Sequence, residues 1–279
     1  MSEPAPHVPP GRPDSPIPSD LDIERALRRA EESGRELPGI DLRESEQLAL
    51  IDELARHYPD LADGSWMRRF TYDNTWFTYA DAILMALFML HFHPRRIVEV
   101  GSGHSTALML DVNDAFLHGD VVITTIDPSA DRLRDIVDES ELEGRLIESI
   151  VQDVPLSTFD ALRSGDILAI DSSHVLKAGS DVKHLIDDVL PRLASGVLVH
   201  IHDVFYPFEY PQSWLRGGAD RNEDYALRAL LSDSSRYRIL LFTDFLISFH
   251  ADLLQARMPL VLERPFPTGG IWLAIADQS

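Results

Sequence analysis

The sequence predicts an α/β domain built on a doubly wound, mostly parallel sheet of seven strands, with an N-terminal helical extension. From residue 95 onward, short apolar segments alternate with segments of helical periodicity. Several apolar segments are nearly continuous in valine, isoleucine and leucine, which is typical of parallel strands covered on both faces. The last two, at residues 237–242 and 269–276, suit a strand pair that closes one edge of the sheet.

The part of the chain before the sheet divides into a tail and helices. Residues 1–20 are rich in proline and polar residues, a composition typical of disorder. Helices are expected at residues 21–36 and 42–58, where apolar residues recur at helical spacing. An aromatic-rich connector then leads into a helix at residues 79–91.

The remaining elements follow in order. The expected strands are residues 96–100, 121–127, 145–153, 166–171, 196–203, 237–242 and 269–276. The expected helices are residues 104–117, 129–140, 156–163, 180–193 and 223–232, with one more before the last strand. This order divides the chain into a disordered tail (1–20), a helical extension expected to act as a lid (21–78) and the sheet domain (79–279).

Charge and composition exclude several functions. The net charge is −21, from 25 basic and 46 acidic residues, which argues against nucleic acid or an anionic membrane as a partner. The longest apolar run, residues 82–90, is too short to span a membrane. The chain starts without a signal-peptide pattern and contains no cysteine. A cytoplasmic protein is expected, and the sequence leaves a homo-oligomer open.

Polar residues gather where the predicted strands end. Asp127, Asp171, His202 and Asp203 lie at carboxyl ends of strands, the edge at which doubly wound sheets bind ligands. His200 lies deeper in its strand and is expected to be an ordinary buried side chain.

The stretch "VEVGSGHST", residues 98–106, forms the turn after the first strand. Gly101 and Gly103 permit positive φ and close approach to a ligand. Thr106 stands where a dinucleotide-binding fingerprint has its third glycine. Glu99 precedes this loop, and Asp127 is placed to accept hydrogen bonds from a ribose.

The E-x-G-x-G pattern followed by an acid at the end of the second strand resembles the class I S-adenosylmethionine-dependent methyltransferases, over roughly residues 70–276. The resemblance implies their Rossmann-like fold and S-adenosylmethionine as methyl donor. It implies that the glycine loop contacts the amino-acid part of the donor, Asp127 its ribose and Asp153 its adenine, under the connector. The implied donor-binding residues are Tyr72, Asn74, Glu99, Gly101, Ser102, Gly103, Ser105, Asp127, Asp153 and Asp171; Phe77 would help cover the donor.

The segments "IDSSH" and "HIHD" carry the candidate chemistry. They resemble the metal-assisted O-methyltransferases, which implies a divalent ion, magnesium or manganese, held by Asp171, His202 and Asp203. His202 departs from that pattern, because magnesium prefers oxygen ligands. His174, in the loop after the fourth strand, would then take the proton of the acceptor.

A second mechanism needs no metal. In it, His174 or His202 is the base, and Asp171 or Asp203 orients the imidazole. The catalytic candidates are therefore His174, Asp171 and His202.

The predicted function is O-methylation of a hydroxyl on a small molecule such as a sugar, a polyol or a natural product. Two alternatives stay open. The protein could bind S-adenosylmethionine without catalysis, or it could be an NAD-dependent oxidoreductase, although neither lysine has the tyrosine four residues before it that short-chain dehydrogenases use.

Overall fold

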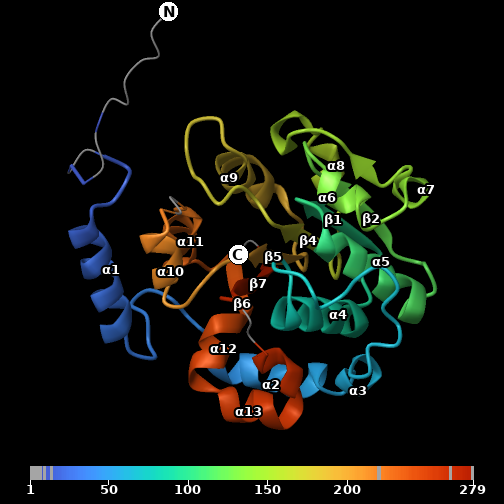
Figure 1. Ribbon diagram of the computed structural model, residues 1–279, viewed down its shortest axis with the longest axis horizontal. Helices are drawn as coiled ribbons and strands as arrows, with labels where there is room; N and C mark the ends of the chain where they lie inside the picture. Colours follow the sequence, from blue (N-terminus) through green and yellow to red (C-terminus); the bar gives the residue numbers. More distant parts are fainter. Residues whose placement is uncertain (1–7, 9–10, 13–14, 219–220, 264–265, 278–279) are drawn as a thin grey trace, which may run out of the picture.

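The computed structural model describes residues 8, 11–12, 15–218, 221–263 and 266–277; the predicted tail, residues 1–20, lies partly outside them. A seven-stranded sheet has the order β3-β2-β1-β4-β5-β7-β6 (Figure 1). Its strands are β1 (Arg96–Val100), β2 (Val122–Ile126), β3 (Leu146–Ile147), β4 (Ile167–Ile170), β5 (Leu198–His202), β6 (Tyr237–Phe242) and β7 (Gly270–Ile275). The first five are parallel, and β7 pairs antiparallel with β5 and β6. The predicted fold class is confirmed.

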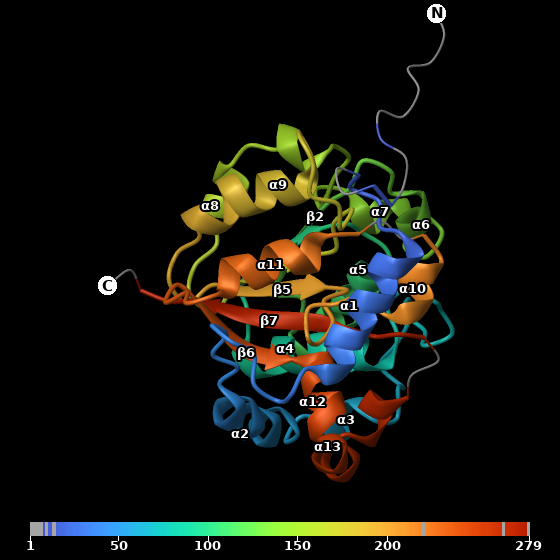
Figure 2. The ribbon, with the colours of Figure 1, turned by 90° about the vertical axis from the view of Figure 1, so that its left-hand side faces the viewer.

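Helices cover both faces of the sheet. Figure 2 shows α8, α9 and α11 on one face and α2, α4, α12 and α13 on the other. The helices are α1 (Asp20–Glu32), α2 (Glu44–Leu54), α3 (Tyr58–Leu61), α4 (Tyr79–Phe92), α5 (His104–Phe116), α6 (Asp131–Arg134), α7 (Glu139–Leu142), α8 (Ser157–Asp160), α9 (Asp181–His184), α10 (Gln212–Arg216), α11 (Glu223–Leu231), α12 (Thr243–Phe249) and α13 (Ala251–Arg257). Further helical turns are η1 (Val151–Asp153), η2 (Leu185–Val189), η3 (Leu190–Arg192) and η4 (Pro259–Leu262). None of the helices in the described part combines the length and apolar character that crossing a bilayer requires.

Several predicted elements differ from the structure. The helix expected at residues 180–193 consists of α9, η2 and η3, the one helix expected before the last strand is the pair α12 and α13, and α10 was not predicted. The strand expected at residues 145–153 pairs only at Leu146 and Ile147, because β3 is an edge strand and the chain then turns into η1. The helix expected at residues 129–140 is split into α6 and α7. Asp138 takes an extended conformation at the start of α7 and so interrupts it.

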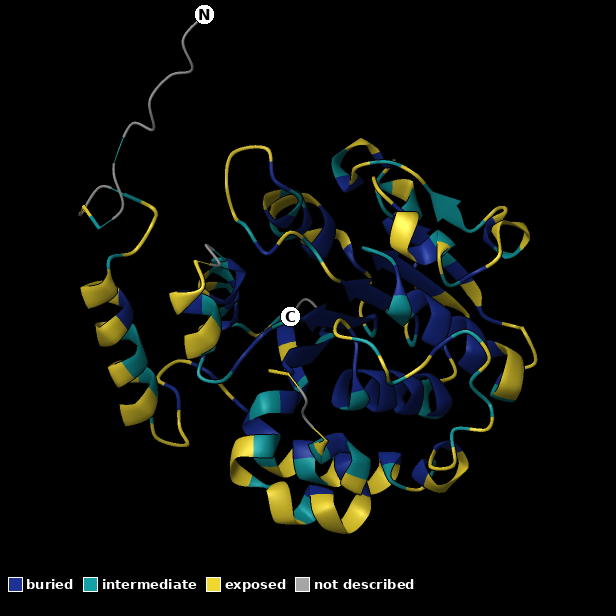
Figure 3. Ribbon diagram, in the orientation of Figure 1, coloured by how far each residue is buried: buried dark blue, intermediate teal, exposed yellow. Residues whose placement is uncertain are grey.

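The N-terminal helices differ in how they pack. Ile51, Leu54 and Leu61 of α2 and α3 are buried in the main core with α4. In contrast, α1 buries only Ile23, which belongs to a small separate cluster with residues after β5. Figure 3 shows the outer face of α1 exposed along its length. Of the predicted extension, α1 is thus the part attached most lightly to the domain.

Candidate active site at the carboxyl edge of the sheet

The turn after β1 lies against the end of β4. Gly101 has φ 88°, and a Cβ atom there would lie 2.4 Å from the carbonyl oxygen of Asp171. No L side chain fits this close approach, since the clash is with backbone. The glycine therefore lets the loop and Asp171 share one edge.

Glu99 lies beneath this loop. Its buried carboxylate accepts hydrogen bonds from the hydroxyls of Ser105 and Thr106 at the start of α5. Burial raises the pKa of Glu99 to about 7, although these hydrogen bonds oppose the rise. Glu99 and Ser105, both predicted to bind the donor, are thus placed to fix the shape of the loop.

A cavity of about 410 Å³ opens above the glycine loop. Among its lining residues are Gly101, Asp127, Gln152, Asp171 and Lys177. The Asp127 carboxylate accepts hydrogen bonds from the Ser102 hydroxyl at 2.6 Å and the Ser129 amide at 2.8 Å. The cavity has the polar residues, at the switch point of the sheet, that binding a nucleoside requires.

Asp153 is not among the residues that line this cavity. It is exposed in η1, whereas its neighbour Gln152 lines the cavity and donates a hydrogen bond to the Gly179 carbonyl. The role of Asp153 on the adenine side stays a prediction; the residue that lines the cavity is its neighbour Gln152, because the chain turns in η1 where a strand was expected.

The side chains of the connector mainly contact other residues of the connector or the start of α4. The side-chain oxygen of Asn74, Oδ1, accepts hydrogen bonds from the backbone amides of Trp76 and Phe77. Tyr72 stacks on Tyr79 with ring centroids 4.5 Å apart, and burial raises the pKa of its hydroxyl to about 12. Tyr72, Asn74 and Phe77 are not among the residues lining the cavity.

Trp76, in contrast, reaches toward the glycine loop. Its ring is 58% exposed and lies under the guanidinium of Arg132, 3.8 Å from the ring centroid. A Cβ atom on Gly103 would lie 3.1 Å from Cδ of Arg132. This cation–π pair, which the sequence analysis did not find, lies beside the loop.

His174 connects three carboxylates. Its Nδ1 lies 2.8 Å from Oε2 of Glu223, and its Nε2 lies 3.2 Å from Oδ1 of Asp171 and 3.5 Å from Oδ2 of Asp203. The backbone explains why Glu223 arrives there: the His174 carbonyl accepts hydrogen bonds from the amides of Asn222 and Glu223 at the start of α11. The structure thus brings the predicted Asp171, His174 and Asp203 together.

The hydrogen bonds of His174 indicate its charge. Carboxylates only accept, so the contacts favour a proton on both ring nitrogens: Nδ1 is hydrogen-bonded to Glu223, and Nε2 lies within ion-pair distance of Asp171. Burial opposes that charge, but the bonds to Asp171 and Glu223 outweigh it and raise the pKa of His174 to about 10. A protonated ring has no lone pair for a substrate proton. The role of His174 as the base stays a prediction, one that these contacts do not favour.

Asp171 is the exposed carboxylate of this cluster, with 46% of its side chain accessible. Burial of part of the group favours the neutral acid, but the hydrogen bond from His174 and the nearby positive charges lower the pKa of Asp171 to about 2. Asp171 therefore stays ionised at neutral pH. Because it also lines the cavity, it joins the two halves of the site.

His202 lies deeper. Its Nε2 is 3.5 Å from Oδ1 of Asp203, and its Nδ1 is 3.8 Å from Oδ1 of Asp81, a distance too long for a hydrogen bond. Burial raises the pKa of Asp81 to about 7. The ring of Phe77 covers His202 at 5.4 Å between centroids. Asp81 was missed, although an acid within the apolar run 79–90 was a signal for it.

Arg221 is the other residue that sequence reasoning missed. Its Nη1 lies 2.6 Å from Oδ2 of Asp203, and its guanidinium lies 4.3 Å from the ring centroid of Trp214. In the sequence, Arg221 and Glu223 look like the ordinary polar start of a helix. They belong to the site only because the start of α11 packs against the loop after β4.

The backbone is strained at both loops of the cluster. His174 has φ 58° and Asp203 has φ 57°, in the left-handed region that non-glycine residues rarely adopt. Such strain persists where the surroundings hold it in place, and it concentrates at functional sites. Here the hydrogen bonds of Glu223 and Arg221 to these two residues supply that restraint.

The donor set does not fit the predicted divalent ion. Asp171 and Asp203 point at the N–H groups of His174 and Arg221, not at a shared empty point. In the described residues no group of three or more histidine, aspartate and glutamate side chains is arranged to hold a metal. Asp171, His202 and Asp203 are therefore not assembled as a ligand set.

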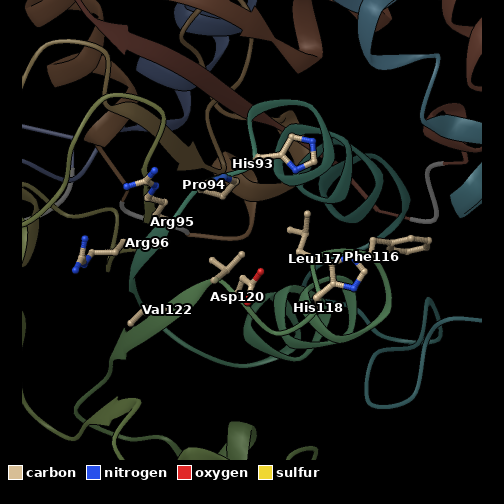
Figure 4. Close-up of a pocket in the computed structure, with 10 residues that line it drawn as sticks. His93, Pro94, Arg95, Arg96, Phe116, Leu117, His118, Asp120 and Val122 are labelled. Atoms are coloured by element: carbon tan, nitrogen blue, oxygen red, sulfur yellow. The ribbon is translucent and has the colours of Figure 1, made fainter.

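Two further regions contain histidine side chains, but neither has the features of a functional site. His200 is buried and stacks on Trp272 at 4.6 Å, and burial lowers its pKa to about 3, as a core residue would show. A cavity of about 640 Å³ lies at the opposite edge of the sheet, near Arg95, Arg96 and His118 (Figure 4). In that view the two arginine side chains point away from His118, so the charges do not converge.

The aromatic stretch after β5 mostly packs inward. Phe205 and Tyr210 are buried with Ile23 of α1. A cavity of about 550 Å³ remains between this loop and α1, lined by Tyr206 and Glu31 among others.

Comparisons with known proteins give a family match and several similar proteins. Residues 98–204 match the family model described as "Methyltransferase domain". An uncharacterized protein of Archaeoglobus fulgidus is 35% identical over 170 residues, which are 57% of this chain and 75% of that protein. The SAH-bound methyltransferase PaMTH1 of Podospora anserina is similar in structure (TM-score 0.45, 16% identity, 92% of this chain and 97% of that one). So is a putative O-methyltransferase of Klebsiella pneumoniae (TM-score 0.44, 13% identity, 91% and 96%).

Proposed function

Because the chain belongs to the class I S-adenosylmethionine-dependent methyltransferases, we propose that it methylates a hydroxyl group of a small molecule such as a sugar, a polyol or a natural product. One observation carries this proposal. The Asp171 carboxylate both lines the cavity beside Gly101 and Asp127 and belongs to the His174 cluster. A hydroxyl that hydrogen-bonds to Asp171 would therefore lie next to the donor.

The donor supplies an electrophilic methyl group on a sulfonium. In the proposed step, a C–O bond forms to the acceptor oxygen while the C–S bond breaks, so S-adenosylhomocysteine leaves. Asp171 accepts the hydroxyl hydrogen bond and takes the proton. Asp171 is a weak base. The protonated ether that forms when the methyl group is transferred is a strong acid, however, so a carboxylate is basic enough to take its proton.

The surrounding residues hold Asp171 for this role. Nε2 of His174 lies 3.2 Å from Oδ1 of Asp171 and restrains the direction of the carboxylate. Asp127, placed by Ser102 and Ser129, would accept from the ribose of the donor. Positioning of this kind is a large part of what a methyltransferase contributes, because the reaction is an in-line displacement.

The test is transfer of a labelled methyl group to a panel of matched alcohols and amines. We expect labelled ethers from the alcohols, and a Asp171→Asn variant that binds the donor normally but transfers methyl at least about a hundredfold more slowly. If only the amines became labelled, the acceptor group would be an amine and the proposed hydroxyl would be wrong. Donor binding without any transfer would favour a catalytically silent protein.

Three sequence-based predictions accompany the proposal. The acceptor is taken to be a small molecule, with neither nucleic acid nor a membrane as partner. The cytoplasmic location is proposed from the composition. A homo-oligomer is left open, as before.

A further inference from the structure

The reacting centre contains its own positive charges. Asp171 and Asp203 come from neighbouring strands, and the Nε2 of His174 lies between them, at 3.2 Å and 3.5 Å from their oxygens. Arg221 donates to the same carboxylate oxygen of Asp203 that faces His174, at 2.6 Å. The point between the two carboxylates is thus occupied by nitrogen, not open to solvent.

His174 cannot easily leave that position. Glu223, of which 4% of the side chain is exposed, accepts from Nδ1 of His174 and from the hydroxyl of Ser172. The His174 carbonyl is fixed by the amides of Asn222 and Glu223. Both the ring and the backbone of His174 are therefore fixed by hydrogen bonds.

Arg221 is similarly held. Its guanidinium lies over the ring of Trp214 while it donates to Asp203. A cation that stacks on an aromatic face and pairs with a carboxylate gains from both contacts. Asp203, with 14% of its side chain exposed, is thereby satisfied without a metal ion.

We propose that His174 and Arg221 are the resident counter-cations of this site and take the place that a divalent metal would occupy between Asp171 and Asp203. This inference rests on the proposed function, because it concerns the charge balance around the acceptor. Glu223 acts in it as a positioning residue, through His174. It departs from the metal-assisted group that the sequence resembles, whose carboxylates would need to be free of such partners to bind a hard cation.

Functionally, two nitrogen groups held in fixed positions keep the place between the carboxylates filled. An acceptor hydroxyl meets Asp171, whose Oδ1 already faces Nε2 of His174 at 3.2 Å. No divalent ion has to be captured before the acceptor binds.

The experiment measures manganese binding to the full-length protein by electron paramagnetic resonance of free Mn²⁺. Wild type is compared with Asp203→Asn and with Asp187→Asn, a control that removes an exposed carboxylate outside the site. We expect the three proteins to bind the same small amount of Mn²⁺, through the acidic surface. One equivalent of Mn²⁺ bound by wild type and lost only in Asp203→Asn would overturn the proposal.

A second variant tests the role of Arg221 directly. Arg221 is 30% exposed, so Arg221→Met is expected to fold, which circular dichroism would check. We expect this variant to gain Mn²⁺ binding that disappears again in Arg221→Met/Asp203→Asn. If Arg221→Met binds no more Mn²⁺ than wild type, Arg221 is not what keeps the metal out.

Calorimetry of S-adenosylhomocysteine on the same samples, once in EDTA and once with Mn²⁺, separates this inference from the proposed function. Absence of binding under both conditions would contradict the methyltransferase proposal without altering the manganese result. Metal-dependent donor binding would contradict the inference alone.

Discussion

At the reacting centre, the role of His174 follows from its hydrogen-bond partners more than from its residue type. A histidine after a strand end suggests a base, and the sequence analysis predicted one. Carboxylates at both ring nitrogens make it a permanent donor instead. These contacts place His174 between Asp171 and Asp203, and for a ring protonated at both nitrogens the proton acceptor would be another group.

This charge state predicts a pH dependence of stability. The folded-state pKa of His174 is about 10, against 6.5 for an ordinary histidine, so the native state binds more protons than the unfolded state between these values. Its contribution is complete below pH 6.5 and is lost as pH rises through about 10. We expect the free energy of unfolding, measured in urea, to fall over this range in wild type and to fall less in His174→Gln. Parallel pH profiles of the two proteins would contradict the assignment.

Gly101 gives a second prediction at the residue scale. Gly101→Ala must accept φ 88° and a Cβ atom 2.4 Å from the Asp171 carbonyl, whereas Gly144→Ala meets only an unfavourable φ of 74° with open space around it. The left-handed conformation alone costs about 1–2 kcal/mol. We expect Gly101→Ala to lose roughly 1–3 kcal/mol more than Gly144→Ala, through overpacking. Equal losses in denaturant titrations would show that the loop and β4 do not touch as described.

At the scale of elements, the connector before α4 is held by one buried carboxylate. Oδ2 of Asp111 in α5 accepts from the backbone amides of Arg68, Arg69 and Phe70, and Oδ1 pairs with the Arg69 guanidinium. This clamp fixes where the connector enters the region of Trp76. It matters to the site because Trp76 and Arg132 lie beside the glycine loop.

The clamp is tested by comparing two acids on the same helix. Asp111→Ala leaves three backbone amides without their acceptor and removes one of the three carboxylates that pair with Arg69, so we expect a loss of about 3 kcal/mol or more in the free energy of unfolding. Asp114→Ala removes a carboxylate with 42% of its side chain exposed, also paired with Arg69, and should cost about 1 kcal/mol or less. Similar losses for both variants would mean that the connector is held elsewhere.

Elements were predictable where local pattern and tertiary packing agree. The strand at residues 96–100 and the helix at residues 79–91 match β1 and α4 closely, because both are apolar and fully packed. The strand expected at residues 145–153 shrank to two residues, since an edge strand has one partner and its pattern is weakly constrained. The short helix α10 was missed, because the prolines around it indicated a loop.

For the whole molecule, the sequence predicted the edge of the sheet at which the site lies but not its chemistry. Asp127, Asp171 and Asp203 could be placed because strand ends of a parallel sheet meet at one edge. Arg221 and Glu223 could not, since α11 reaches that edge only through contacts with residues 174–176. The charge balance of the site, and with it the fit to a metal, depends on these two residues.

The central claim is that the cavity beside Gly101 and Asp127 binds the methyl donor. The most direct measurement is calorimetric titration of S-adenosylhomocysteine, in EDTA, into wild type, Asp127→Ala and Asp153→Ala. Hydrogen bonds to a charged group contribute about 1.5–3 kcal/mol. We therefore expect roughly 10- to 100-fold weaker binding in Asp127→Ala and unchanged binding in Asp153→Ala, whose side chain lies outside the cavity lining. Unchanged affinity in Asp127→Ala, or no binding to wild type, would contradict the account.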